Sequence, residues 1–387
     1  MNILYISPIN ITIPGGEANH FMAIGGNLQK LGNELLTICC GKGKKFQYLH
    51  VKYVPHLGIP YLTALTTDFF LSLYLFYYIL RFKPDVVYYR GVTLAGSISR
   101  IFKVASVAEA NGIYPDEVKI ERPSFFKLFG NFLKLREWIN YYFATRIICV
   151  TEGIRNKLGE NYGIKSEVCT VIPNGVNTDV SRPMDKAVCK KKLGLAEDCF
   201  YVGFVGFFRF WQGLNTLIEA MKITKDAGYN EIHCVLVGDG GPMGYLRKMV
   251  EQFDLEEETV FTGKIEYKDV ATFINSFDIC YLSKIGLNFG FSPLKLYEYL
   301  ACARPVIASR VQGVTEVIEE GKCGYLFEPH DPKDLAFRIM QSYEERGKLR
   351  ELGHNGRIFV EKNYNWAKIA KRVEIVLKEA IEVNSRI

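Results

Sequence analysis

The stretch YVGFVGFFRFWQGLNTLIEA spans residues 201 to 220. Its first residues form an apolar run typical of a buried strand, Gly206 opens a loop, and the remainder has the apolar spacing of an amphipathic helix. A strand that leads through a glycine-bearing loop into a helix is the repeating unit of parallel sheets. The stretch therefore predicts an α/β fold, with a loop whose backbone N–H groups are suited to phosphate.

The same alternation of short strands and longer helices recurs on both sides of this stretch. The strand-like runs are NILYIS (2–7), ELLTICC (34–40), DVVYY (85–89), ASVAEA (105–110) and RIICV (146–150) before it, and IHCVLVG (232–238), TVFTG (259–263), ICYLS (279–283), PVIAS (305–309) and GYLFE (324–328) after it. Two Rossmann-like, doubly wound units in tandem are the simplest arrangement that accounts for them.

The predicted boundary between the units lies where Asn174, Gly175 and Pro183 interrupt the pattern. We predict an N-terminal unit, a C-terminal unit and a last helix that crosses back to the first unit, over residues 1–178, 179–365 and 366–387. Ligands of open α/β sheets bind beyond the carboxyl ends of the strands. Two such units facing each other would therefore bind a molecule in the cleft between them.

Composition excludes several classes of protein. The chain has 387 residues and a net charge of +6, without an arginine-rich tract, so phosphates or lipid headgroups are expected partners and nucleic acid is not. Ten cysteines occur without a CxxC pair, which predicts reduced core thiols in the cytoplasm and no structural zinc. The N-terminus lacks the basic region of a signal peptide, and the longest apolar stretch, Phe69 to Leu80, is too short to span a bilayer.

The run SPLKLYEY begins at Ser292 and reads as the start of a helix. Ser292 is the expected N-cap and Pro293 the first helical residue, which leaves the N–H groups of Leu294 and Lys295 for an anion. Lys295 and Glu298 share a helix face, and their plainest interpretation is a surface ion pair worth a few tenths of a kcal/mol. In the alternative interpretation, Lys295 binds a diphosphate and Glu298 accepts hydrogen bonds from a ribose diol.

Two glycine-bearing loops are further candidates. Arg209, three residues after Gly206, supplies a permanent cation for phosphate, or is a solvated loop residue. In the run IPGGEANHF, Gly15 and Gly16 let the backbone approach a ligand closely, and His20 follows in the first helix with either a structural or a functional role.

The run SVAEANG places polar residues at the end of a predicted strand. Glu109 and Asn111 should be partly buried there and therefore need hydrogen-bond partners. A bound sugar would provide them, and so would a purely structural network.

With these motifs in order, the chain resembles the retaining glycosyltransferases of the GT4 family, which have the two-Rossmann GT-B fold. The resemblance covers nearly the whole chain and is carried by PGGEANHF, VIPNGVN, VGFFRFWQGLNTLIEA, LVGDGG, VFTGKI and SPLKLYEYLACARPVIAS.

Two departures from the family pattern change the expected site. The family commonly has two glutamates seven residues apart; Glu298 matches the second, while Gly290 stands at the first, as in an SPxKxxEY variant. Phe207 and Gln212 stand where arginine and lysine are usual, so Arg209 and Lys295 are expected to bind the phosphate charge.

The resemblance implies transfer of a sugar, with retention of configuration, from a UDP- or GDP-sugar on the C-terminal unit to a saccharide or lipid-linked acceptor on the N-terminal unit. Polysaccharide, O-antigen or glycolipid synthesis is the implied setting, and no metal or other cofactor is expected. The implied catalytic residues are His20, Glu109, Asn111, Arg209 and Lys295. The implied donor-binding residues are Gly15, Gly16, Gly206, Arg209, Lys264, Ile265, Ser292, Pro293, Leu294, Lys295 and Glu298.

Three other functions are compatible with an α/β chain of this kind. A sugar-nucleotide epimerase on the same fold is the main alternative, and product analysis with and without acceptor separates the two. A dehydrogenase would need a GxGxxG fingerprint, which the chain lacks, and a secreted solute-binding protein would need a signal peptide.

In residues 119–146, phenylalanines alternate with basic residues, among them Lys119, Arg122, Lys127, Lys134 and Arg136. This mixture predicts an interfacial helix that touches the inner face of the cytoplasmic membrane; the alternative is a helix that buries its aromatic residues in the N-terminal core.

Overall fold

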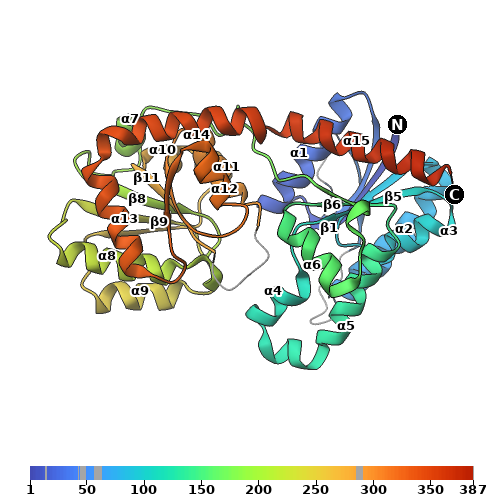
Figure 1. Ribbon diagram of the computed structural model, residues 1–387, viewed down its shortest axis with the longest axis horizontal. Coiled ribbons are helices and arrows are strands. Elements are labelled where there is room, and N and C mark those ends of the chain that lie inside the picture. The colour runs from blue at the N-terminus through green and yellow to red at the C-terminus, as the bar shows by residue number, and fades with distance from the viewer. Residues whose placement is uncertain (14, 42, 44–48, 56–62, 285–290, 387) are drawn as a thin grey trace. The chain divides into compact units, whose positions relative to one another are not determined.

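The computed structural model describes all residues except 14, 42, 44–48, 56–62, 285–290 and 387. The chain divides into two compact units. Unit 1 comprises Met1–Gly175 and Trp366–Ile387, and unit 2 comprises Val176–Asn365. Each unit is built on one parallel sheet that is covered by helices (Figure 1).

The sheet of unit 1 has the strand order β3-β2-β1-β4-β5-β6-β7, and every pairing is parallel. Its strands are β1 (Asn2–Asn10), β2 (Glu34–Cys40), β3 (His50–Val54), β4 (Val86–Tyr89), β5 (Ala105–Ala110), β6 (Arg146–Cys149) and β7 (Cys169–Val171). The order reverses between β1 and β4. Loops diverge at such a switch point, so the carboxyl ends of these two strands border a natural binding site.

Helices cover both faces of this sheet. They are α1 (Gly16–Lys30), α2 (Thr63–Phe82), α3 (Ala95–Ile101), α4 (Tyr114–Glu121), α5 (Pro123–Tyr142), α6 (Glu152–Tyr162) and α15 (Trp366–Asn384). Parallel crossovers are right-handed, so α1, which leads to β2, lies on the face opposite to α2, α3 and α5, which lead toward β4, β5 and β6. The returning helix α15 packs against α1 and β5.

The segment 119–146 is not one helix. It breaks at Arg122, which has φ −141° and ψ 66° because the next residue is Pro123, and a residue before proline is pushed out of the helical region. Its aromatic residues are divided between core and surface: Tyr141 is buried, whereas Phe129 and Phe132 are 42% and 45% exposed.

The sheet of unit 2 has the order β10-β9-β8-β11-β12-β13, again parallel, with its switch point between β8 and β11. Its strands are β8 (Phe200–Val205), β9 (Ile232–Val237), β10 (Thr259–Gly263), β11 (Ile279–Leu282), β12 (Val306–Ser309) and β13 (Gly324–Phe327). Its helices are α7 (Lys186–Lys192), α8 (Leu214–Asp226), α9 (Met243–Gln252), α10 (Val270–Ser276), α11 (Leu294–Ala301), α12 (Thr315–Gly321), α13 (Pro332–Glu344) and α14 (Leu349–Asn363).

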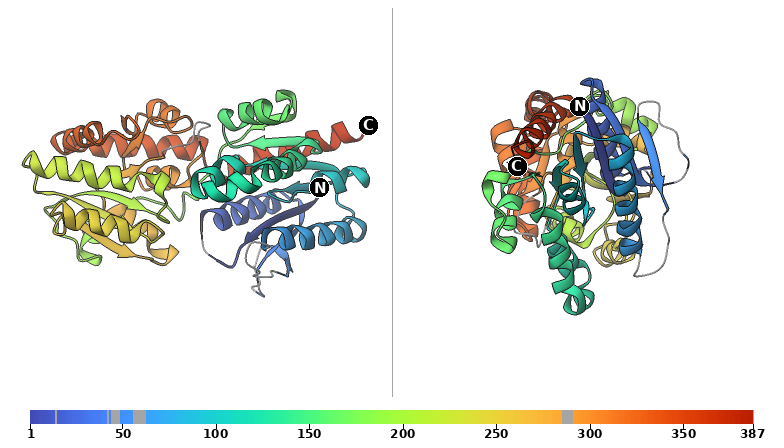
Figure 2. Two further views of the ribbon diagram at one scale, coloured as in Figure 1. Left: turned by 90° about the horizontal axis from the view of Figure 1, so that it is seen from below. Right: turned by 90° about the vertical axis from the view of Figure 1, so that its right-hand side faces the viewer.

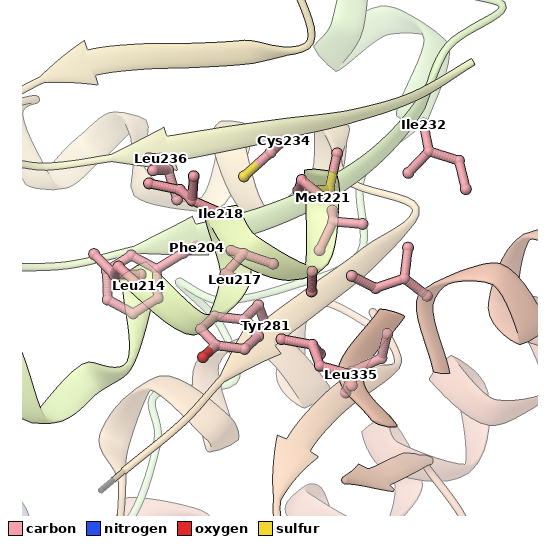
Figure 3. Close-up of a cluster of buried hydrophobic side chains, with 14 of the residues drawn as sticks. Phe204, Leu214, Leu217, Ile218, Met221, Ile232, Cys234, Leu236, Tyr281 and Leu335 are labelled. Carbon is pink, nitrogen blue, oxygen red and sulfur yellow. The ribbon is translucent and has the colours of Figure 1, made fainter. Parts of the chain in front are cut away.

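The core of unit 2 fixes the strand that leads into the phosphate-type loop. Phe204 of β8 is fully buried with Leu214 and Leu217 of α8, Cys234 and Leu236 of β9, and Tyr281 of β11 (Figure 3). Burying each large apolar side chain contributes about 1.5–3 kcal/mol relative to exposure. The end of β8 is therefore held rigidly.

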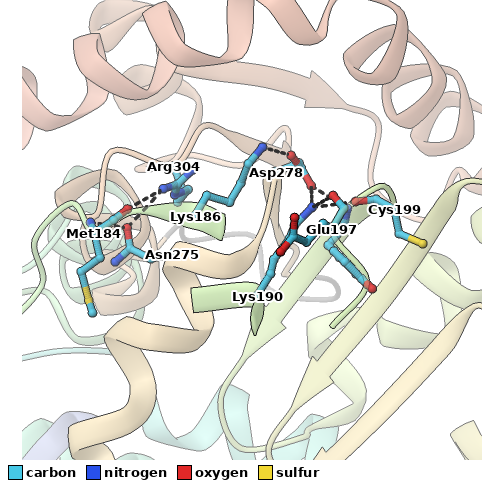
Figure 4. Close-up of polar contacts among 9 residues, drawn as sticks. Met184, Lys186, Lys190, Glu197, Cys199, Asn275, Asp278 and Arg304 are labelled. Atoms are coloured by element: carbon cyan, nitrogen blue, oxygen red, sulfur yellow. Dashed lines mark hydrogen bonds and ion pairs between the residues drawn. The ribbon is translucent and has the colours of Figure 1, made fainter. Parts of the chain in front are cut away.

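Polar contacts fix the amino-terminal ends of the strands in unit 2 (Figure 4). Asp278, just before β11, forms ion pairs with Lys186 and Lys190 and accepts the Tyr201 N–H at 2.9 Å. The Lys190 ammonium also donates to the carbonyls of Glu197 and Cys199, at 3.2 and 2.7 Å. These residues lie at the edge opposite to the carboxyl ends of the strands, so their role is structural.

The ten cysteines are free, and nine of them are buried. Within the described ranges, no helix is long and apolar enough to cross a membrane. No cluster of His, Cys, Asp and Glu suited to a metal ion occurs among those same residues.

Candidate functional site

Helix α11 of unit 2 starts one residue later than predicted. Pro293 is the N-cap and Leu294 the first helical residue, so the assignment of these roles to Ser292 and Pro293 was wrong. The Ser292 hydroxyl lies 2.9 Å from the Tyr297 hydroxyl and does not cap the helix. The N–H groups of Leu294 and Lys295 are still the first two of the helix, which have no carbonyl partner within it.

The Lys295 side chain lies against the end of β8. Its ammonium is 4.4 Å from the centre of the Phe204 ring, and a Cβ atom at Gly206 would overlap the lysine side chain. Gly206 has φ +147°, a conformation that favours glycine. Glycine is thus required at this position both by the backbone and by the approach of Lys295.

Lys295 and Glu298 are both half-buried and carry shifted pKa values. Burial lowers the pKa of Lys295 to about 7, and burial raises the pKa of Glu298 to about 7; the opposite charge of the other residue reduces each shift. No ion pair joins the two side chains within the part of unit 2 that the structure describes. The interpretation as a surface ion pair is therefore wrong.

The loops after β8, β9 and β10 pack backbone against backbone at the carboxyl ends of these strands. The Phe208 N–H donates to the Asp239 carbonyl at 2.8 Å, and the Gly238 N–H donates to the Gly263 carbonyl at 3.0 Å. A Cβ atom at Gly240 would overlap the backbone of Phe208. The close approach of these loops brings three glycine-bearing segments to the same edge.

The loop after β10 carries Lys264 and Ile265. Lys264 is exposed and Ile265 packs against the core. Tyr267, which sequence reasoning missed, has a pKa raised by burial and by the nearby charge of Glu298. Its location in a polar loop gave no signal that it would lie close to this carboxylate.

Arg209 is exposed and lies over two aromatic rings. Its guanidinium is 4.8 Å from the centre of the Phe207 ring and 5.3 Å from that of Trp211. Gln212 has a buried Oε1 that accepts no hydrogen bond from the described residues. Gly290, the position of the first family glutamate, lies outside those residues.

The second group of predicted residues meets in unit 1. His20 Nε2 lies 2.8 Å from Glu109 Oε1, Tyr88 donates its hydroxyl to Oε2, and Asn111 donates its amide to Oε1. Burial alone would raise the pKa of Glu109, but His20, Arg90 and the Asn111 hydrogen bond outweigh it and lower the pKa well below its usual value. Glu109 is thus an ionised, buried carboxylate with internal partners.

The space beside this network is small. A cavity of about 10 Å³ is lined by His20, Tyr88 and Glu109 together with residues of β6 and α15. Such a cavity holds roughly one water molecule. The His20 ring also makes an edge contact with Trp366, 5.1 Å between ring centres, so the network is closed by α15.

The start of α1 is open. A Cβ atom at Gly15, the N-cap, would meet no other atom within 4 Å, and Gly16 is the first helical residue. Arg90, which sequence reasoning missed, follows β4 and has a side chain only 16% exposed, 3.4 Å from the exposed Glu17. It was missed because a single arginine after a strand carries no motif.

Family models match both units. One described as Glycosyltransferase Family 4 matches residues 14–180, and one described as Glycosyl transferases group 1 matches residues 185–359. An uncharacterized glycosyltransferase of Methanocaldococcus jannaschii is 30% identical over 61% of this chain, and the chain spans 60% of the length of that relative. The capsular polysaccharide biosynthesis glycosyltransferase CapM of Staphylococcus aureus is 25% identical over 68% of this chain and 70% of its own length.

Solved structures share the fold. HepE of Anabaena, determined in complex with UDP, has a TM-score of 0.78 at 19% identity, over 98% of this chain and 100% of HepE. HepE was also determined in complex with UDP-glucose. With a family model on each of its two Rossmann-like units, the chain belongs to the GT4 family of glycosyltransferases and has the GT-B fold.

Proposed function

We propose that the protein transfers a sugar from a nucleotide diphosphate sugar to an acceptor hydroxyl, with retention of the anomeric configuration. The observation that carries the proposal is the start of α11, where a half-buried lysine and glutamate with shifted pKa values form no ion pair with each other. The mutual attraction of the two groups compensates their burial only in part, and perturbed groups of this kind cluster at functional sites. A bound donor would supply the missing partners.

Unit 2 is the proposed donor side. The N–H groups of Leu294 and Lys295, with the Lys295 ammonium, form an anion site in which the diphosphate would be bound. Glu298, one turn further, would accept hydrogen bonds from the ribose hydroxyls. Arg209 would add a permanent cation on the leaving-group side, stiffened by its contacts with Phe207 and Trp211.

The donor would be a UDP- or GDP-sugar. Because HepE was solved with UDP and with UDP-glucose, uridine nucleotides are the first to test.

Unit 1 is the proposed acceptor side. Glu109 is ionised and fully partnered, so its chemical part is to hold His20 in one orientation rather than to remove a proton. In the proposed reaction the bond from the sugar C1 to the diphosphate oxygen breaks, and the acceptor oxygen bonds to C1 on the same face. The acceptor proton passes to the departing phosphate oxygen, whose growing charge Lys295 and Arg209 stabilise.

The acceptor would be a saccharide or a lipid-linked saccharide, in polysaccharide, O-antigen or glycolipid synthesis. CapM, a relative named for capsular polysaccharide biosynthesis, supports this setting. A position at the inner face of the membrane, with contact through residues 119–146, is part of the proposal. The exposed Phe129 and Phe132 beside basic residues of α5 support it.

The test begins with a screen of UDP- and GDP-sugars for thermal stabilisation of the full chain. A ligand at 100 times its Kd adds about 2.7 kcal/mol to the free energy of unfolding. The donor that stabilises is then incubated with acceptor candidates, and the product is analysed by mass spectrometry and by NMR of its anomeric proton. An inverted product would reject retention, and interconversion of the donor without acceptor would identify an epimerase.

A further inference from the structure

The outer side of α2 in unit 1 is unusually apolar. Six large apolar side chains, each between 40% and 60% exposed, recur every three or four residues and so share one helix face. This α2 stripe consists of Leu65, Phe69, Leu73, Phe76, Tyr77 and Leu80. The opposite side of the helix buries Leu71, Leu75 and Ile79.

No charged side chain interrupts the α2 stripe. Between Thr63 and Leu80 the sequence has one charged residue, Asp68, and it points away from the stripe. Its carboxylate accepts the Thr93 N–H at 2.9 Å and lies 3.3 Å from the Arg136 guanidinium of α5. The charge that would otherwise oppose burial of this helix is thus bound within unit 1.

The stripe ends beside a cluster of cations. Arg81 follows Leu80 directly and Lys83 comes two residues later, and an edge contact of 5.1 Å between Phe76 and Phe102 brings the end of α3 next to them. The basic cluster, all of it exposed, consists of Arg81, Lys83, Arg100 and Lys103. Ile101, 77% exposed, lies among them, and the nearby acidic Asp85 accepts the Asn2 N–H at 2.7 Å.

We propose that the α2 stripe lies in the surface of an anionic lipid bilayer, with the basic cluster on the headgroup phosphates. An apolar row leaves water at the headgroup boundary while cations next to it pair with anionic lipid, and both contributions favour the same orientation.

The geometry of α2 sets the depth of this contact. The helix packs along β1, β2 and β3 with its other side, so only the striped half of its circumference can meet lipid. Figure 2 shows α2 at the surface of unit 1, away from α15. The inference extends the proposed membrane contact of residues 119–146 to a second helix, and its test does not depend on sugar transfer.

The first experiment removes the stripe. The full chain is sedimented with vesicles of phosphatidylcholine, with or without phosphatidylglycerol, and the variant Phe69→Ser/Leu73→Ser is compared with it. Burial of two large apolar side chains predicts a partition coefficient at least roughly tenfold lower for the variant. The matched control is Phe337→Ser/Ile358→Ser in unit 2, whose side chains are 55% and 51% exposed; it should bind like the unaltered protein.

The second experiment neutralises the cluster. Arg81→Gln/Arg100→Gln should bind phosphatidylglycerol vesicles more weakly, by about fivefold for each residue, because each cation near an anionic surface contributes about 1 kcal/mol. The loss should vanish at high salt. This variant leaves every core contact of α2 in place, so it keeps the test valid if the serine variant fails to fold.

Several results would overturn the proposal. One is failure of the unaltered protein to bind anionic vesicles at low salt; another is equal loss in the stripe variant and its unit 2 control. A dimer seen by sedimentation velocity that Phe69→Ser/Leu73→Ser dissolves would assign the stripe to a second copy instead. Stabilisation by nucleotides is measured separately on the same variants, so failure of the donor proposal and failure of this one are distinguishable.

Discussion

Glu109 of unit 1 is buried and Glu298 of unit 2 is half-buried, each near the carboxyl edge of a parallel sheet, yet their pKa values shift in opposite directions. Hydrogen bonds and charges from His20, Arg90 and Asn111 hold the pKa of Glu109 low, whereas burial raises the pKa of Glu298 to about 7. The difference lies in the partners. Unit 1 compensates its carboxylate internally, whereas the described residues of unit 2 form no ion pair with Glu298, which we propose binds the donor.

The largest expected effect comes from Lys295→Ala. It removes a cation whose attraction grows as the leaving group gains charge, so turnover should fall by a barrier of about 2–4 kcal/mol with a smaller change in donor affinity. Single-turnover kinetics and UDP titration separate the two. The control is Lys268→Ala, an exposed lysine of the same unit paired with Glu266. Equal kinetics for both variants would mean that Lys295 does not bind the diphosphate.

Glu298→Gln should chiefly weaken nucleotide binding. The amide keeps the shape but loses charge-assisted hydrogen bonds to the ribose, each worth about 1.5–3 kcal/mol. Calorimetric titration with UDP measures the loss, and Glu319→Gln, which faces Arg310 on the surface, serves as control. A lower melting temperature with unchanged UDP binding would give Glu298 a structural role like that of Glu109.

Glu109→Gln should have the opposite effect to Glu298→Gln: a loss of stability and not of nucleotide binding. It leaves the buried partners of the carboxylate poorly satisfied, so the free energy of unfolding should fall by about 1–3 kcal/mol while UDP binding is unchanged. Because the folded-state pKa of Glu109 is lowered, its contribution to stability is present above the unfolded pKa and is lost as the pH falls. Chemical denaturation at pH 7 and at pH 4 checks both points, with Glu17→Gln as the exposed control. Loss of UDP binding without loss of stability would contradict the comparison, because Glu109 would then act in ligand binding and not in stability.

The smallest effect is the pH dependence of UDP affinity. The ammonium of Lys295 loses its proton as the pH rises through about 7, and Glu298 gains one as the pH falls through about 7. Each change removes a charge that the nucleotide would contact. The affinity for UDP should therefore peak near pH 7 and fall by up to about tenfold per pH unit on each side.

Two variants separate the acidic limb of this pH profile of UDP affinity from its alkaline limb. Lys295→Arg keeps its charge at every working pH and should retain only the acidic limb, whereas Glu298→Gln should retain only the alkaline limb. A flat profile in the unaltered protein would show that neither group changes its protonation state when the nucleotide binds.

Most of the fold follows from the sequence, and the exceptions have physical reasons. The predicted strands all form, but β3 and β7 were missed because HVKYV is a half-buried edge strand and CTV is only three residues long. The start of α11 was misplaced by one residue because the hydroxyl of Ser292 bonds a tyrosine five residues later, a contact that only packing decides.

The site residues that lie together in one sequence motif could be predicted. The contacts that depend on which strands pair could not. Lys295 and Glu298 stand in a recognisable run, and their roles toward a donor stay a prediction. The contact of Glu109 with Tyr88 depends on the pairing of β4 with β5, and Tyr88 reads in the sequence as one more apolar strand residue. The approach of Tyr267 to Glu298 likewise joins the segment after β10 to helix α11, and the two carry no shared pattern.

Helix α15 belongs to unit 1, although the 190 residues of unit 2 separate it from the rest of that unit. Proteins are synthesised from the N-terminus, and domains tend to fold as they emerge from the ribosome. Unit 2 is continuous and can fold at once, whereas β5 and the His20 ring wait for Ile369, Val373 and Trp366 to cover them. The nascent chain therefore exposes the apolar surface of β4, β5 and β6 that α15 later covers throughout the translation of unit 2, and this surface is where a chaperone would be needed.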